Sequence, residues 1–270
     1  MRKTTQWIAV CSPLLLAGNL VHAQDEPSAA ELAKKLSNPV AALISVPFQL
    51  NYDTDIGPED AGDRVTLNIQ PVIPVDLNDD WNLISRTILP VVDQQDIFPG
   101  AGSQSGIGDV VQSVFFSPKA PTASGWIWGA GPVALLPTGS DDLLSAEKWG
   151  IGPTAVALKQ TGHWTYGALA NHIESVAGDS DRADISSTFL QPFLSYSTST
   201  GVSYTVNSET TYDWETDETT MPINFMVNKI GKIGGQMIQY GGGIRYWADS
   251  PESGPEGFGF RLNFVLLYPR

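Results

Sequence analysis

The final stretch of the chain, Phe258 to Tyr268, reads FGFRLNFVLLY and alternates in character at every second position. One face carries Phe258, Phe260, Leu262, Phe264, Leu266 and Tyr268, and the other carries Gly259, Arg261 and Asn263 before Val265 and Leu267. Residues two apart share one face of a β-strand, so the stretch predicts a strand with one apolar and one partly polar face. A soluble sandwich would bury the aromatic face, whereas a membrane barrel would turn it to lipid. The number and connections of such strands decide between these folds.

The same alternation continues through the chain from Val40 onward and predicts twelve strands. They span residues 40–52, 62–75, 81–92, 106–118, 125–137, 148–160, 163–174, 185–197, 201–212, 218–230, 234–248 and 256–268. The connections alternate between short turns and mostly longer loops, which is typical of bacterial outer-membrane barrels, as is an even strand number. The predicted fold class is all-β: a transmembrane antiparallel up-and-down β-barrel of about 12 strands, with a short N-terminal helix.

Acidic residues gather in the longer connections. Of the 29 Asp and Glu residues, 19 lie in or beside them. They are Asp53, Asp55, Glu59, Asp60, Asp93, Asp96, Asp141, Asp142, Glu147, Asp179, Asp181, Asp184, Asp213, Glu215, Asp217, Glu218, Asp249, Glu252 and Glu256. A soluble sandwich gives no reason for this preference, so the distribution favours the membrane barrel. Two roles stay open for these acids: binding divalent cations that bridge lipopolysaccharide, and simple solvation, which we favour.

Tryptophans mark the predicted strand ends. Trp81, Trp126, Trp128, Trp149, Trp164 and Trp247 lie close to them. Membrane barrels place aromatic residues at both interfaces, so we expect these side chains to form aromatic girdles.

The N-terminus has the features of a secretory signal. Arg2 and Lys3 precede an apolar segment from Trp7 to Leu20, and Val21-His22-Ala23 then places Val21 and Ala23 at the usual cleavage positions. We therefore predict a signal peptide over residues 1–23 and export of the mature protein to the bacterial outer membrane.

Removal of this segment changes the composition of the chain. The single cysteine, Cys11, would leave with it, so the mature chain would have neither disulfides nor thiolate metal sites. The 15 basic residues would fall to 13 against 29 acids, a formal net charge of −16. Such a charge argues against nucleic acid as a partner.

Residues 24–38 are expected to hold a helix ahead of the barrel, which would span residues 39–270. Ser28 and Glu31 have the spacing of a capping box, Leu32 and Leu36 stack one turn apart, and Asn38-Pro39 ends the helix. The narrow apolar stripe allows two positions: free in the periplasm, which we favour, or folded into the barrel as a partial plug.

Prolines conflict with a continuous ladder. Pro71, Pro132, Pro153, Pro192 and Pro222 fall inside predicted strands, where each removes a hydrogen-bond donor. We expect bulges or bends at these positions.

Polar residues on the inward faces are the candidate lumen-lining set. They are Asn68, Gln70, Arg86, Asn207, Glu209, Asn224, Asn228, Arg245, Arg261 and Asn263. A charge facing lipid at the bilayer midplane costs roughly 2–4 kcal/mol, so a membrane barrel turns these side chains inward. Two roles stay open: lining a conduction path, or cross-linking a narrow lumen into a plug.

The residues needed for catalysis or metal binding are sparse. After cleavage the histidines left are His163 and His172, and their spacing does not suit a metal site. Asn171, His172 and Ser175 suggest a hydrolase triad, but His172 would lie on the opposite strand face from the other two. We therefore predict no catalytic residues, no metal and no cofactor.

Several segments resemble one bacterial family. They include NPVAALISVPFQLNYD (38–53), GIGDVVQSVFFSP (106–118), GPVALLPTG (131–139), KWGIGPTAVALKQTGHWTYGALANHIESVAG (148–178) and NSETTYDW (207–214). These are similar to proteins named for the MetA pathway of phenol degradation, members of which are often mislabelled neuromedin U. The resemblance covers about residues 31–270 and implies an outer-membrane barrel, often described as a transporter, that passes aromatic or other small organic compounds.

The functional prediction follows from the barrel. We expect a passive channel or facilitator for small solutes, embedded in outer-membrane lipid and lipopolysaccharide. Its partners would include the barrel-assembly machinery, for which Tyr268 would supply the C-terminal aromatic signal although Pro269 and Arg270 follow it. The alternatives are a closed structural or surface-interaction barrel with acidic outer loops and, less favoured, a membrane lipid hydrolase.

Overall fold

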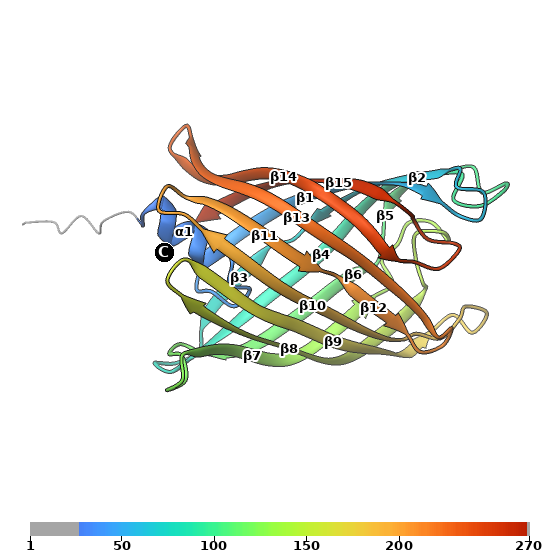
Figure 1. Cartoon of the computed structure of the whole chain (residues 1–270). Helices are drawn as coiled ribbons and strands as arrows, with labels where there is room; N and C mark the ends of the chain where they lie inside the picture. The colour runs from blue at the N-terminus through green and yellow to red at the C-terminus, as the bar shows by residue number, and fades with distance from the viewer. Residues whose placement is uncertain (1–26, 269–270) are drawn as a thin grey trace, which may run out of the picture.

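A computed structural model describes residues 27–268, which form a short helix and a closed antiparallel β-barrel (Figure 1). The predicted signal peptide, residues 1–23, lies outside the described residues. Fifteen strand segments make twelve barrel strands, because three barrel strands are each divided in two. The divided strands are β2 (Gly62–Ile69) with β3 (Val72–Asp76), β5 (Ser103–Ile107) with β6 (Val110–Pro118), and β11 (Val202–Ser208) with β12 (Thr210–Asp213).

The other nine strands are undivided. They are β1 (Ile44–Ile56), β4 (Trp81–Gln95), β7 (Trp126–Leu136), β8 (Lys148–Thr161), β9 (Trp164–Gly178), β10 (Ser186–Ser197), β13 (Glu218–Ile233), β14 (Gln236–Asp249) and β15 (Phe258–Tyr268). The barrel closes where β1 pairs with β15, from Ile44 opposite Tyr268 to Tyr52 opposite Phe260. The predicted twelve-stranded antiparallel barrel is confirmed.

Prolines interrupt the ladder at only some of the expected positions. Pro71 separates β2 from β3, and the β13–β14 register shifts at Pro222. Pro132, Pro153 and Pro192 lie inside continuous strands, although pairing with one neighbouring strand lapses beside Pro132 and Pro153. A bulge of the expected kind is therefore found at Pro222, whereas the register on both sides of Pro71 is the same.

The outer surface of the barrel is apolar. Along β15, Phe260 is 60% exposed while its neighbour Arg261 is 2% exposed. The other large apolar side chains of this face, Phe258, Leu262, Phe264 and Tyr268, are also exposed. A continuous belt of this kind is suited to hydrocarbon and not to water, so the barrel is of the membrane-spanning type.

Aromatic side chains meet at the barrel ends, as girdles require, with one correction. Trp81 packs edge-on against Trp128 and Trp126 against Tyr166, with ring centroids 5.8 and 6.2 Å apart. Trp247 was expected in a girdle, but its indole Nε1 donates to Asp53 inside the barrel. The alternation that turns Arg245 inward also turns Trp247 inward.

Helix α1 (Ala29–Leu36) lies at the end of the barrel where β15 terminates, which we call the helix end (Figure 1). Its capping box is formed, since Ser28 Oγ accepts from Glu31 N and Glu31 Oε2 accepts from Ser28 N. These bonds lower the pKa of Glu31. No helix of the described part of the chain has the length and hydropathy to cross a membrane.

The position of α1 differs from the favoured expectation of a helix free in the periplasm. Leu32 and Ala33 are fully buried against inward-facing apolar residues, namely Leu43, Ile230, Val265 and Leu267. Gln160 donates to the carbonyl of Lys34 at 2.8 Å. Gly201 lies so close that a Cβ there would be 2.7 Å from the Cβ of Ala29. Burial of this apolar stripe holds α1 against the inside of the barrel.

Candidate functional site

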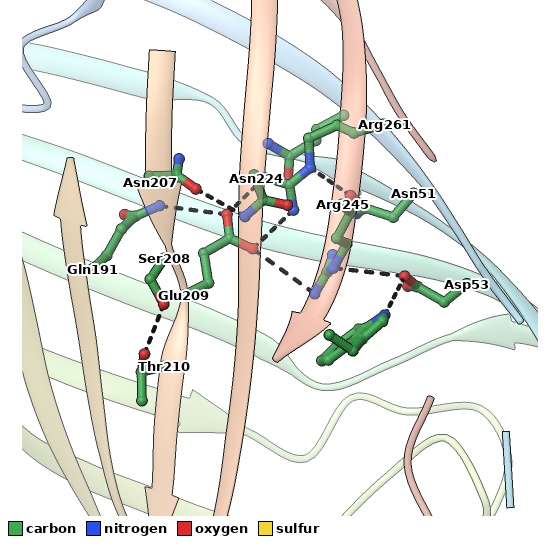
Figure 2. A network of polar contacts seen from close by, with 12 residues as sticks. Asn51, Asp53, Gln191, Asn207, Ser208, Glu209, Thr210, Asn224, Arg245 and Arg261 are labelled. Atoms are coloured by element: carbon green, nitrogen blue, oxygen red, sulfur yellow. Dashed lines mark hydrogen bonds and ion pairs between the residues drawn. The ribbon is translucent and has the colours of Figure 1, made fainter. Parts of the chain in front are cut away.

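The candidate site is the barrel interior, and its centre is a carboxylate cross-linked to arginines (Figure 2). Arg261 of β15 donates through Nη1 and Nη2 to the two carboxylate oxygens of Glu209, both at 2.8 Å. Its Nε also donates to Asn51 Oδ1 of β1 at 2.6 Å. Two-pronged pairing of guanidinium and carboxylate is strong and directional, so this contact joins distant strands across the lumen.

A second arginine extends the network toward the end that carries the long loops, which we call the loop end. Arg245 Nε lies 3.5 Å from Asp53 Oδ1, and its Nη2 lies 3.9 Å from Glu209 Oε2. The guanidinium carbon stacks 4.3 Å from the ring centroid of Trp247, which itself bonds Asp53. The network therefore runs from mid-barrel to the loop end.

Asp53 and Asn51 were not among the predicted interior residues. The sequence reasoning assigned Asp53 to an outer loop, but β1 continues to Ile56 and the Asp53 side chain is 8% exposed. The signal was present, because Asn51 and Asp53 alternate with the apolar Leu50 and Tyr52. The acidic residues that follow in the loop made Asp53 look like part of that loop, so this alternation was not used.

The predicted asparagines pair with one another on the interior wall. Asn224 Nδ2 donates to Asn207 Oδ1 at 2.8 Å, and Asn263 Nδ2 lies 3.5 Å from Asn228 Oδ1. Neighbouring strands supply the first pair, in which Asn207 lies opposite Asn224 in register. The second pair spans β14, because Asn228 of β13 and Asn263 of β15 both lie opposite Gly241. These amides form a polar strip that leads from the Glu209 network to α1.

Two interior arginines have neutral partners. Arg86 Nη2 donates to Gln70 Oε1 at 2.9 Å, and Gln70 Nε2 lies 3.4 Å from Gln49 Oε1. Arg64 Nε donates to Gln94 Oε1 at 2.8 Å. Arg64 was not predicted, although it alternates with Val65 on the same strand as Asn68.

Cavities follow one another along the barrel. A loop-end cavity of about 480 Å³ and a middle cavity of about 400 Å³ share Asn68 and Glu209 as lining residues. Two helix-end cavities, of about 200 and 160 Å³, share Gln191 with the middle cavity. Every one of the ten predicted residues lines at least one of these cavities except Asn224, which is fully buried.

The middle cavity has two chemically different walls. The side formed by β1 to β4 is polar apart from Ile88 and carries Gln49, Asn68, Gln70 and Arg86. The side formed by residues 111–191 is mostly apolar and carries Val111, Leu135, Leu169, Ile173, Ile185 and Phe189, with the polar Ser113, Asn171, Ser187 and Gln191 among them. The sequence prediction missed the apolar wall because inward and outward residues are both apolar there, which removes the period-two signal.

Several loop acids are held in specific contacts. Lys148 Nζ donates to Asp184 Oδ1 at 2.9 Å, and this hydrogen bond lowers the pKa of the exposed Asp184. Arg182 donates to the carbonyls of Asp142 and Ser145. Among residues 27–268, no group of three or more His, Cys, Asp or Glu side chains could hold a metal ion.

The residues considered for a hydrolase are not brought together. Asn171 lines the middle cavity, whereas Ser175 Oγ donates to Asp184 at 3.2 Å. His172 Nε2 instead lies 2.8 Å from Glu174 Oε1, and its Nδ1 lies 2.9 Å from Thr188 Oγ1. The Asn171–His172–Ser175 arrangement is therefore not formed.

Comparison with known proteins gives a structural likeness and no sequence match. No protein-family model and no curated protein sequence matches this chain, so the resemblance to the phenol-degradation family stays a prediction. The structure is similar to a COG4313 outer membrane channel from Pseudomonas putida F1, with TM-score 0.66, 17% identity, and coverage of 84% of this chain and 96% of that one. Outer membrane phospholipase A from Escherichia coli gives TM-score 0.49 and 12% identity over 84% of this chain and 98% of that one. What the likeness to the channel shows is the barrel fold.

Proposed function

We propose that this protein is a narrow, passive channel or facilitator for small organic solutes in the bacterial outer membrane. The observation that carries the proposal is the row of cavities from the loop end to α1, in which neighbouring cavities share lining residues. The fold shared with a protein described as an outer membrane channel supports it. In this function the lipid and lipopolysaccharide of that membrane are its surroundings, and the barrel-assembly machinery inserts it.

Two constrictions divide the path. The Glu209–Arg261 pair lies between the loop-end and middle cavities, and α1 covers the helix end. A solute would enter from the loops, pass the arginine network and leave beside α1. Selection then depends on width and charge, with no cofactor and no covalent step.

The middle cavity supports small solutes with apolar parts. Its apolar wall would contact a hydrocarbon or aromatic group, and its amides would bond a polar one. This lining agrees with the aromatic or other organic compounds that the family resemblance implies.

Planar-bilayer recording on the purified mature protein tests the proposal, after a heat-dependent gel shift has shown a folded barrel. We expect small discrete conductance steps, and larger steps when residues 24–38 are deleted, because the deletion removes α1. Liposomes containing the protein should also take up a small aromatic solute faster than empty liposomes.

The closed structural barrel makes the opposite prediction. Full burial of Leu32 and Ala33 favours a lumen that stays shut. If a folded barrel gives neither conductance nor solute uptake, with or without residues 24–38, the channel proposal is wrong and the closed barrel stands.

A further inference from the structure

Within residues 27–268, Arg86 is a charged group inside the barrel that makes neither a hydrogen bond nor a close ion pair with a carboxylate. Its hydrogen bond within residues 27–268 goes to the neutral amide of Gln70, at 2.9 Å. A guanidinium carries five N–H donors, so donors are left facing the middle cavity that Arg86 lines. Burying a charge without an anion is costly, and the site would therefore be stabilised by an anionic ligand.

The carboxylate of Glu209, which also lines the middle cavity, is already paired with other arginines. Both oxygens of Glu209 accept from Arg261 at 2.8 Å, and one of them also lies 3.9 Å from Arg245. The charged side chains that line the loop-end and middle cavities are Arg64, Arg86, Arg245 and Arg261 against Asp53 and Glu209. The lining thus has an excess of positive charge that the protein's own acids do not neutralise.

The opposite wall determines what else the ligand must contain. Leu135, Leu169, Ile173 and Phe189 face the same cavity of about 400 Å³ as Arg86. A small inorganic anion would leave this apolar surface uncovered, and an uncharged hydrocarbon would leave the guanidinium unpaired. A molecule with an anionic head and an apolar body would pair with the guanidinium of Arg86 and also cover the apolar side chains.

We propose that the middle cavity is a binding site for a small amphiphilic monocarboxylate. The carboxylate binds the guanidinium of Arg86 beside Gln70, and the apolar body lies against Leu169 and Phe189. A planar carboxylate matches the fork of the guanidinium, and its single charge limits repulsion from Glu209. The inference deepens the proposed function, since the ligand would be a solute that the channel passes.

Equilibrium binding to the full mature protein in lipid nanodiscs tests the site, with octanoate and octan-1-ol as probes of equal chain length. We expect octanoate to bind about tenfold more tightly than octan-1-ol, because a charge-assisted hydrogen bond adds at least 1.4 kcal/mol. Arg86→Gln should remove this preference while leaving octan-1-ol binding unchanged. Arg64→Gln is the matched control, because it also removes an amide-bonded arginine that lines a neighbouring cavity, and it should keep the preference.

The outcomes separate this inference from the channel proposal. If the wild type shows no preference for octanoate, or Arg86→Gln retains it, the inference is overturned, whatever the conductance. If the preference depends on Arg86 but no solute crosses a liposome, the site stands and the channel proposal fails. Should Arg86→Gln not fold, Arg86→Lys is the second variant. It keeps the positive charge but loses the two-pronged geometry of the guanidinium, so we expect it to show a weaker preference for octanoate over octan-1-ol.

Discussion

At the scale of single residues, Arg261 shows why charges are tolerated in this barrel. The side chain is 2% exposed, yet each of its nitrogens has an acceptor, two from Glu209 and one from Asn51. Hydrogen bonding of both ions offsets the cost of taking them from water. Removing one ion alone leaves the other buried and unpaired.

Arg261→Met should therefore lower the free energy of unfolding by about 3 kcal/mol. Urea unfolding of the folded barrel, followed by tryptophan fluorescence and the gel shift, measures the change. The double variant Arg261→Met, Glu209→Leu should recover part of the loss, because it removes the uncompensated carboxylate. An equal or larger loss in the double variant would show that packing, and not charge, accounts for the effect.

Asp184 gives a pH-dependent contact at the loop end. Its pKa is lowered from 3.8 mainly by the hydrogen bond from Lys148. A carboxyl whose folded pKa is depressed stabilises the contact above its unfolded pKa, and this stabilisation is lost as pH falls through the lower folded value. Protection of residues 179–185 from hydrogen exchange should therefore drop as pH is lowered below about 3.8.

The Asp184→Asn variant isolates this contact from other acids in the loop. It should show reduced protection already at neutral pH and a smaller further drop in acid. Asp181→Asn is the control, because the side chain of Asp181 has no part in the Lys148 contact. If both variants keep the wild-type pH profile, the Lys148–Asp184 bond does not hold the loop.

At the scale of elements, α1 depends on the barrel as well as on its own sequence. An eight-residue helix is marginal in water, even with a capping box. Its buried side, Leu32 and Ala33, packs on Leu43, Ile230 and Leu267, while Lys35 stays exposed. The helix and the covering of the helix end therefore form together.

Leu32→Asp should release α1, since it places an unpaired carboxylate in this apolar cluster. Bilayer conductance should rise toward that of the 24–38 deletion, and a protease should cut the released segment. Ala30→Asp introduces the same side chain on α1 outside this apolar cluster and outside the lining of the two helix-end cavities, and it should leave both measurements unchanged. Equal conductance in the two variants would contradict the covering role of α1.

At the scale of the whole molecule, the apolar surroundings of the barrel determine which strand faces can be predicted from the sequence. Where the inward face is polar, as on β13 and β15, period-two alternation located the strands to within a few residues. On strands such as β6 and β8, Phe115, Val156 and Leu158 are buried inward while the outward face is apolar too, so the faces stayed ambiguous. The position of α1 depends on the surface that the folded barrel offers it, and the inward position of Asp53 depends on where β1 ends. The local sequence pattern contains neither piece of information.

The distribution of charge across the whole lumen predicts ion selectivity. Four arginines and two acids line the loop-end and middle cavities, so the path should favour anions. In a KCl gradient, the reversal potential should therefore lie on the chloride side of zero. Arg64→Gln removes one positive charge from this path and should shift the potential toward the potassium side, at the cost of the bond to Gln94.

Lys229→Gln removes the same charge from an exposed position on β13, outside the lumen, and serves as the matched control. Its reversal potential should equal that of the wild type, because Lys229 lies on the outward face of β13 and lines none of these cavities. If Arg64→Gln also leaves the potential unchanged while conductance persists, the ions do not pass these arginines. The current would then follow a route other than the row of cavities, and the path proposed through Asn68 and Glu209 would be wrong.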